Sequence, residues 1–289
     1  MKILRSALLL VAASFFANAV GDSHAVAQEI MAHHVVTAAD VNWEQLNPKR
    51  GDASPKAATL WGDRNGSEAT GFLVKFVDGF SSPAHIHNVS YRGVVINGLV
   101  HNDDPKAAPM WMPPGSFWTQ PAGEVHITSA KGRETVAYIE IEQGPYLVMP
   151  VEQQFDRGER PVNVDPSNIV WLNASNTNWI DQSESPDLAH EAQIAFLWGN
   201  PKPNQLNGTL IKLPAGFTGE IRSQSDFKAV VIEGKLKYQA NVSQESQTLS
   251  PGSYFSSTGE TMRQVSSDAG DVCIIYVRSQ GEFRLVSGS

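Results

Sequence analysis

The stretch GFSSPAHIHNVSYRGVVING (79–98) decides the fold, together with GSFWTQPAGEVH (115–126). Residues two apart in a strand point to the same side of the sheet. His85 and His87 therefore project from one strand into one space, and Pro83 marks the start or edge of that strand. This spacing predicts a pair of metal-binding imidazoles on an all-β scaffold.

The second stretch predicts a third imidazole. Pro121 and Gly123 form a turn signal that opens a new strand at His126. A barrel brings that strand opposite the first, so three His side chains meet in an apolar interior. Such a site suits one borderline divalent ion, and the ligands alone leave Fe, Zn, Cu, Ni and Mn open.

The spacing of the two stretches resembles the two sequence motifs of the cupin superfamily. The first reads Gly79-x5-His85-x-His87-x3-Tyr91-x6-Gly98, and the second reads Gly115-x5-Pro121-x-Gly123-x2-His126. The resemblance implies a double-stranded β-barrel of jelly-roll type with one metal ion on three histidines. Two positions depart from the pattern, because Tyr91 stands where cupins carry a Glu ligand and Ala130 stands where an Asn often ends the second motif.

Tyr91 is the candidate catalytic residue, and three roles for it stay open. Its phenol could ligate the metal as a phenolate, since a nearby cation lowers a phenol pKa. It could instead form a hydrogen bond to a metal-bound water or oxygen. It could also fill the barrel, as Phe227 does at the corresponding place in the second half of the chain.

The chain repeats itself at an offset of about 137 residues, which predicts two tandem domains. The matches keep their order, and they include LWGD with LWGN, VVING (94–98) with VVIEG (230–234), and PPGSF (113–117) with SPGSY (250–254). Both halves alternate short apolar runs with turn residues, as all-β barrels do. We therefore expect two tandem jelly-roll (cupin) barrels at 28–149 and 178–289, joined by a connection at 150–177.

The second barrel lacks the ligands of the first. Counting back from Gly234 places Ile221, Ser223 and Phe227 at the positions of His85, His87 and Tyr91, and counting from Gly259 places Met262 at that of His126. We expect this barrel to be structural, with a metal-free small-molecule pocket as the alternative.

Three further polar residues have open roles. Alternation places Glu140 and Glu142 on one strand face with Tyr138, either outside the barrel or supplying the missing carboxylate. His101 precedes an Asn-Asp-Asp-Pro turn, which favours a solvent-facing side chain over one that lines the pocket.

The N-terminus predicts export to the periplasm or the exterior. Lys2 and Arg5 precede an apolar run at 6–20, and Ala25-Val26-Ala27 is a small-x-small cleavage site, so residues 1–27 are expected to be a signal peptide. No other segment is apolar enough to span a membrane after cleavage. The formal charge of -8 argues against a nucleic-acid partner.

The chain resembles secreted two-barrel bacterial cupins related to the ChrR-like group. Cupins of similar ligand arrangement include iron-dependent dioxygenases with three-His centres. A +2 ion held by three neutral imidazoles favours a small anionic or oxygenated ligand. The two interpretations are a metal-dependent dioxygenase and a non-catalytic cupin that binds metal or ligand as a sensor or scavenger. Edge pairing between barrels within one chain is consistent with a monomer or homodimer.

Overall fold

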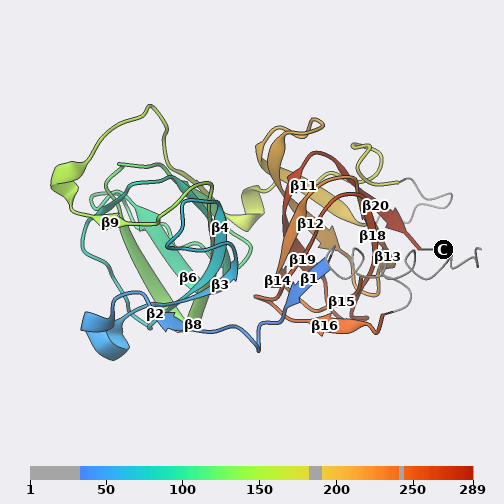
Figure 1. Cartoon of the computed structure of the whole chain (residues 1–289), viewed down its shortest axis with the longest axis horizontal. Helices are drawn as coiled ribbons and strands as arrows, with labels where there is room; N and C mark the ends of the chain where they lie inside the picture. The colour runs from blue at the N-terminus through green and yellow to red at the C-terminus, as the bar shows by residue number, and fades with distance from the viewer. Residues whose placement is uncertain (1–32, 182–190, 241–243, 289) are drawn as a thin grey trace, which may run out of the picture.

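Two β-barrels lie side by side in the computed structural model of the protein (Figure 1). It describes residues 33–181, 191–240 and 244–288. The expected signal peptide, residues 1–27, lies outside the described residues. Within the described ranges, no helix has the length and apolar character that crossing a membrane requires.

The N-terminal barrel consists of a seven-stranded sheet in the order β10-β7-β6-β8-β4-β3-β2 and a two-stranded sheet β5-β9. Its strands are β2 (Glu44–Gln45), β3 (Lys56–Trp61), β4 (Thr70–Phe76), β5 (Ile86–His87), β6 (Tyr91–Asp103), β7 (Phe117–Gln120), β8 (Ile127–Ile141), β9 (Val148–Met149) and β10 (Val162–Val164). Three short 3-10 helices accompany them, at η1 (Pro48–Ala53), η2 (Val151–Gln153) and η3 (Pro166–Asn168).

The C-terminal barrel combines a six-stranded sheet, β1-β17-β14-β19-β12-β11, with a five-stranded sheet, β16-β15-β18-β13-β20. Its strands are β1 (His33–Val36), β11 (Gln193–Gly199), β12 (Leu206–Leu213), β13 (Thr218–Ser223), β14 (Phe227–Glu233), β15 (Leu236–Gln239), β16 (Gln247–Leu249), β17 (Tyr254–Ser257), β18 (Thr261–Ser267), β19 (Cys273–Gln280) and β20 (Phe283–Ser287). The all-β architecture of two tandem barrels is the one that the sequence predicts.

The barrels exchange edge strands. β1, the first described strand, pairs antiparallel with β17 of the second barrel, with His33 opposite Ser257. β10, which follows the N-terminal barrel in sequence, pairs with β7, with Val162 opposite Thr119. β17 and β7, one strand in each barrel, thereby gain a pairing partner, which removes an unpaired edge that could aggregate.

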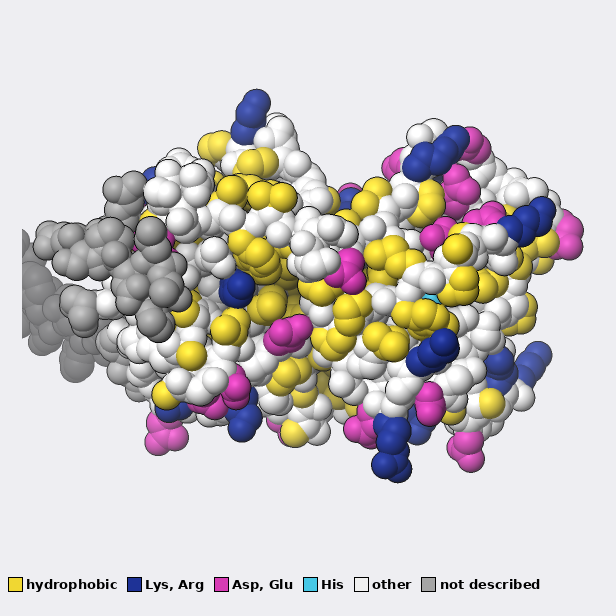
Figure 2. Space-filling view, turned by 180° about the vertical axis from the view of Figure 1, so that it is seen from behind, with side chains coloured by type: hydrophobic (Ala, Val, Ile, Leu, Met, Phe, Trp, Pro, Cys, Tyr) yellow, Lys and Arg dark blue, Asp and Glu magenta, His cyan; other side chains and the backbone are white. Residues whose placement is uncertain are grey.

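Continuous apolar strands line the contact between the barrels, because those strands are buried on both faces. In β6, Val95 faces the interior of its own barrel while its neighbours Val94 and Ile96 join a core shared with the second barrel. Val230 and Ile232 of β14 contribute to the same shared core from the other side. Hydrophobic side chains follow the seam between the barrels in the space-filling view (Figure 2).

Related residues of the two repeats meet across this seam. The Trp61 indole donates to the Tyr138 hydroxyl over 3.1 Å, and Trp198 donates in the same way to Tyr276 over 2.9 Å. The two tyrosine rings contact each other with centroids 5.4 Å apart. The barrels are therefore packed about an approximate two-fold axis that the repeat itself creates.

A buried ion pair between the barrels departs from this approximate two-fold symmetry. Glu140 is fully buried and accepts a hydrogen bond from Arg278 of the other barrel over 3.1 Å. Arg92 lies 3.9 Å from the same carboxylate, pairs with Glu142 at 2.5 Å, and covers the Trp198 ring at 3.7 Å. Glu140 therefore faces the second barrel, and the alternative in which it supplies a metal ligand is wrong.

We expect Glu140→Leu to lower the free energy of unfolding by about 3 to 5 kcal/mol, because it leaves the buried Arg278 guanidinium without its carboxylate. Glu140→Leu combined with Arg278→Met should recover much of that loss. Denaturant unfolding measures both effects. Glu142→Gln, which changes an exposed partner on the same strand, is the matched control and should alter stability little. A loss as large in Glu142→Gln as in Glu140→Leu would contradict the assignment.

Candidate metal centre

Backbone pairing brings the three predicted histidines together. His85 and His126 form an antiparallel bridge in which each backbone N–H donates to the other residue's carbonyl over 3.0 Å. His87 follows two residues after His85, so its side chain enters the same space. The ligand nitrogens of the three side chains all lie within 4.8 Å of one another.

Each imidazole is oriented by a backbone carbonyl. The Nδ1 atoms of His85, His87 and His126 lie 2.8, 2.9 and 3.1 Å from the carbonyl oxygens of Pro83, Leu147 and Glu124 respectively. A carbonyl oxygen only accepts, so Nδ1 carries the hydrogen in each ring. The Nε2 lone pairs are left to face the shared space, which is how metal-binding histidines are held.

Burial keeps the rings neutral. Desolvation lowers the pKa of His126 to about 3, with repulsion from His85 adding to the effect. The pKa of His87 is well below its ordinary value, because of burial first and repulsion from the other two rings second. Burial also lowers the pKa of His85. Neutral imidazoles are the form that binds a metal ion.

This donor set fits a borderline divalent ion. Among the described residues the cluster holds three nitrogen donors and no carboxylate. Glu124, the nearest acid in sequence, points its side chain to Arg160 at 3.2 Å. An ion on this site would keep its full +2 charge and have coordination positions left for small ligands.

Tyr91 reaches the site as a neutral phenol. Its hydroxyl donates to Asn102 Oδ1 over 2.8 Å and lies 3.5 Å from His126 Nε2. Asn102 is itself fixed, since it donates to Gln120 over 2.9 Å and accepts from Thr128 over 2.7 Å. Burial raises the pKa of Tyr91 above its usual value, which favours the protonated form. These contacts suit a hydrogen-bonding role beside the metal.

Sequence reasoning missed Tyr146. Its ring stacks on His87 with centroids 4.3 Å apart, and its hydroxyl donates to His87 Nε2 over 3.0 Å. It also meets Tyr91 edge to face at 5.9 Å. In the second barrel Phe283 meets Phe227 in the same way, at 5.5 Å. Two phenols thus accompany the histidines, and two phenyl rings stand where the histidines are absent.

The equivalent position in the second barrel holds an arginine. Strand register pairs Ile221 with Arg263, as it pairs His85 with His126. The sequence expectation that Met262 replaces His126 is therefore wrong, and Met262 is 46% exposed. The count was off by one residue because it took Gly259 as the counterpart of Gly123, although Arg263 follows Gly252 at the same distance as His126 follows Gly115.

Arg263 fills the space that a metal would need. Its side chain is fully buried and lies over the Phe227 ring at 4.3 Å. It donates to the hydroxyls of Ser223, Ser257 and Thr261. Burial lowers its pKa to about 10, so it stays charged at neutral pH. In the second barrel the charged guanidinium of Arg263 therefore occupies the place where the first barrel has imidazoles.

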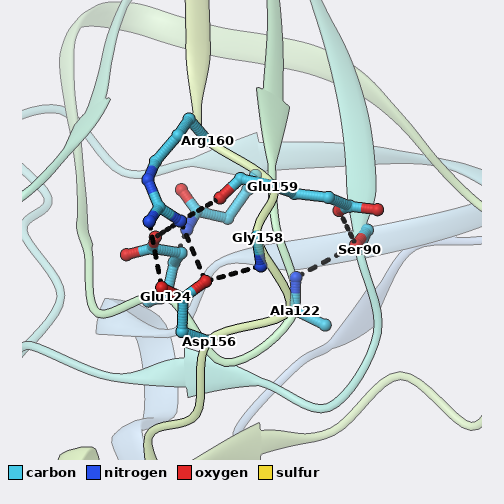
Figure 3. A network of polar contacts seen from close by, with 8 residues as sticks. Ser90, Ala122, Glu124, Asp156, Gly158, Glu159 and Arg160 are labelled. Atoms are coloured by element: carbon cyan, nitrogen blue, oxygen red, sulfur yellow. Dashed lines mark hydrogen bonds and ion pairs between the residues drawn. The ribbon is translucent and has the colours of Figure 1, made fainter.

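A segment after the N-terminal barrel braces the turn that carries the third histidine (Figure 3). Arg160 pairs with Asp156 at 2.9 Å and with Glu124, whose backbone carbonyl orients His126. Phe155 lies so close over Gly123 that a Cβ there would sit 2.3 Å from its carbonyl oxygen, and Gly123 has a φ of +79°. Only glycine fits this turn, which accounts for its place in the second motif.

A cavity of about 650 Å³ adjoins the triad, and His85, His87, Tyr91 and Tyr146 form part of its wall. The remaining wall is mostly apolar and includes Val74, Phe76, Phe80, Trp118, Ile139 and Met149. Its size suits a small organic molecule. His101 lies elsewhere, buried with its Nδ1 3.2 Å from the Met110 carbonyl, so the expected solvent-facing position is wrong.

Comparison with known proteins identifies the family. Residues 34–286 match the family described as Domain of unknown function (DUF4437). The chain belongs to this family. No curated protein matches this DUF4437 protein.

Solved structures of the cupin fold resemble the DUF4437 protein over most of its length. A structure from Nostoc punctiforme, described as a "putative dioxygenase", has a TM-score of 0.62 at 14% identity and covers 87% of this chain and 84% of its own. An oxalate decarboxylase from Lactobacillus farciminis has a TM-score of 0.53 at 8% identity, with 88% of both chains covered. Hazelnut (Corylus avellana) vicilin has a TM-score of 0.51 at 11% identity, with 87% of both covered. The expected cupin fold with two tandem barrels is confirmed.

We expect Tyr91→Phe to retain bound metal at the wild-type stoichiometry, because the hydroxyl bonds to Asn102 and does not replace the missing Glu ligand. Mass spectrometry of the purified variant measures this. Phe227→Tyr in the second barrel is the control for folding. Loss of metal from folded Tyr91→Phe would show that the phenol is a ligand.

We expect Arg263→Met to change the free energy of unfolding by no more than about 1 kcal/mol, because an apolar side chain of similar volume avoids the desolvation of a buried charge. Arg263→Ala should cost about 2 to 4 kcal/mol through the cavity it leaves. Denaturant unfolding compares the two. Equal losses in both variants would show that the charge itself stabilises the barrel.

Proposed function

We propose that this protein binds one divalent metal ion through His85, His87 and His126 and acts as a metal-dependent dioxygenase on a small, anionic, oxygenated organic molecule. The observation that supports this most is the set of three Nδ1-to-carbonyl bonds, which aim three neutral imidazoles at one point. When bound, the metal would act as a Lewis acid and a template for an oxygen donor and for molecular oxygen. The resemblance to a structure described as a dioxygenase supports the same class.

The residues of this chain would bind and orient the ligand and exclude water from it. Tyr91 and Tyr146 bring two phenolic hydroxyls to the His126 and His87 sides of the triad. Burial raises the pKa of both, so each stays protonated. Tyr91 donates its one proton to Asn102, whereas the Tyr146 proton, which is donated to His87 Nε2, would become available to a ligand oxygen when a metal ion bound that nitrogen. The apolar wall of the cavity excludes water from a reactive substrate.

Metal content is the first test. We expect about one equivalent of a single metal in the untagged protein and none in His85→Ala/His87→Ala, measured by mass spectrometry beside circular dichroism to confirm folding. Asp104→Asn, an exposed change away from the triad, is the control. A folded wild type that takes up no metal after reconstitution would refute the metalloenzyme.

Activity is the second test. An oxygen electrode should record oxygen consumption that depends on an added β-diketone or related enolisable acid. His126→Ala should abolish it. Metal-loaded protein that consumes no oxygen with any member of such a panel would favour the non-catalytic alternative, in which the cupin only binds.

We also propose that the protein works in the periplasm or outside the cell. The basic start, apolar run and Ala25-Val26-Ala27 site support this. Cleavage after Ala27 would leave β1 intact, because that strand begins at His33. We expect intact-mass measurement of the exported protein to give a mature chain that begins at Gln28. A full-length chain that stays in the cytoplasm would contradict this.

A further inference from the structure

Arg50 is distinctive among the residues around the cavity. Among the described residues that line the cavity there is no Asp, Glu or Lys, and apart from the histidines Arg50 is the only one of them with a basic side chain. Arg50 is exposed to solvent, so its effect on a ligand would come from direct hydrogen bonding and not from an unscreened long-range field. This single cation could bind a negatively charged group of a ligand at its side of the cavity.

A capped turn holds Arg50 in place. η1 begins after Asn47, whose side chain accepts from the Lys49 backbone N–H over 3.1 Å. The Arg50 N–H donates to the Asn47 carbonyl over 3.0 Å, and Ser54 Oγ accepts from the Asn47 N–H over 2.9 Å. The backbone beneath the guanidinium is therefore fixed, which lowers the entropy lost when a ligand binds.

The guanidinium of Arg50 has an aromatic contact and no acidic partner. It lies 5.2 Å from the centre of the Phe80 ring. Arg64 and Arg92, by contrast, each pair with a carboxylate, at 2.6 and 2.5 Å. No Asp or Glu of the described chain lies within ion-pair distance of Arg50. Its five N–H donors are available to an external anion.

Arg50, Phe80, Ser82 and His85 all line the same cavity. Phe80, under the guanidinium, contacts Phe76 at 5.5 Å, and both rings line the cavity. Ser82 follows, and its Oγ lies 3.4 Å from His85 Nδ1. A ligand that lay along this wall would have Arg50 near one part, aromatic surface beside its middle and His85 and His87 near another part.

Exposed apolar side chains stand at the cavity rim beside the exposed polar residues Asn47 and Arg50. Leu46 is 39% exposed and Val148 is 68% exposed, and both line the cavity. They come from the segment beside β2 and from β9, which belong to different sheets. Exposed apolar side chains at a cavity mouth suit a ligand with an apolar body.

Building on the proposed metal site, we propose that Arg50 binds a carboxylate at the end of the substrate remote from the triad. The substrate class is then an organic acid with an apolar body, whose oxygen donors face His85, His87 and His126. Arg50 is a specificity-determining residue in this arrangement, because a guanidinium forms charge-assisted paired hydrogen bonds with a carboxylate.

The test uses one matched ligand pair, 4,6-dioxoheptanoate and its methyl ester. Both carry the same β-diketone, and only the acid has a charged end. Calorimetry with zinc-loaded protein should show the acid binding about ten-fold more tightly than the ester, as expected for hydrogen bonds to a charged group. Arg50→Gln should remove this preference, and Arg50→Lys should keep part of it. Lys49→Gln, the same charge change in the same turn and off the cavity wall, should leave it unchanged.

Repeating the titrations on His85→Ala/His87→Ala separates the two proposals. Equal weakening of both ligands with the acid-over-ester ratio retained would support the metal site and the Arg50 subsite independently. Unchanged affinities in that variant would refute the metal's role while leaving Arg50 in place. Equal binding of acid and ester by the wild type, or a preference that persists in Arg50→Gln, would refute the subsite. No measurable binding of either ligand at millimolar concentration would refute it as well.

Discussion

The antiparallel pairing of His85 with His126 is the constraint on which the metal centre depends. Two backbone hydrogen bonds of 3.0 Å hold the strand of the first motif against the strand of the second. Because side chains at paired positions lie on the same side of a sheet, both imidazoles enter the barrel from the bridge. His87 and the two phenols then take positions set by that contact. Moving the register by one residue would turn His126 away from the other ligands.

The two barrels show which features belong to the scaffold and which to the site. The tryptophan–tyrosine hydrogen bonds and the shared apolar core occur in both halves. The three imidazoles and the hydroxyls of Tyr91 and Tyr146 have no counterpart at the equivalent positions of the second barrel, where Phe227 and Phe283 stand. In the second, Arg263 and a ring of hydroxyls occupy the interior, and burial of that charge is balanced by neutral acceptors. The loss of Tyr91 and Tyr146 equivalents together with the ligands favours a chemical role for those hydroxyls over simple packing.

Much of this arrangement could be predicted from the sequence, because period-two spacing and turn residues are local signals. They predicted the β class, the two barrels and the convergence of the three histidines. Tyr146 escaped notice because it lies outside both motifs, and only the tertiary fold returns its ring to His87. Glu140 has the alternation of a barrel strand, but whether its face meets solvent or another barrel depends on a contact far away in sequence. Arg263 was missed because Gly259 was taken as the counterpart of Gly123, which shifted the count by one residue.

The exchange of edge strands imposes an order on folding. β1 is made first, yet its partner β17 belongs to the last third of the chain, at Tyr254–Ser257. This first described strand therefore has no sheet partner until β17 has been made, and its docking closes a long loop of the chain. Such a chain cannot complete its native structure while it is still being made. A protein assembled in this way stays incompletely folded until late in its synthesis.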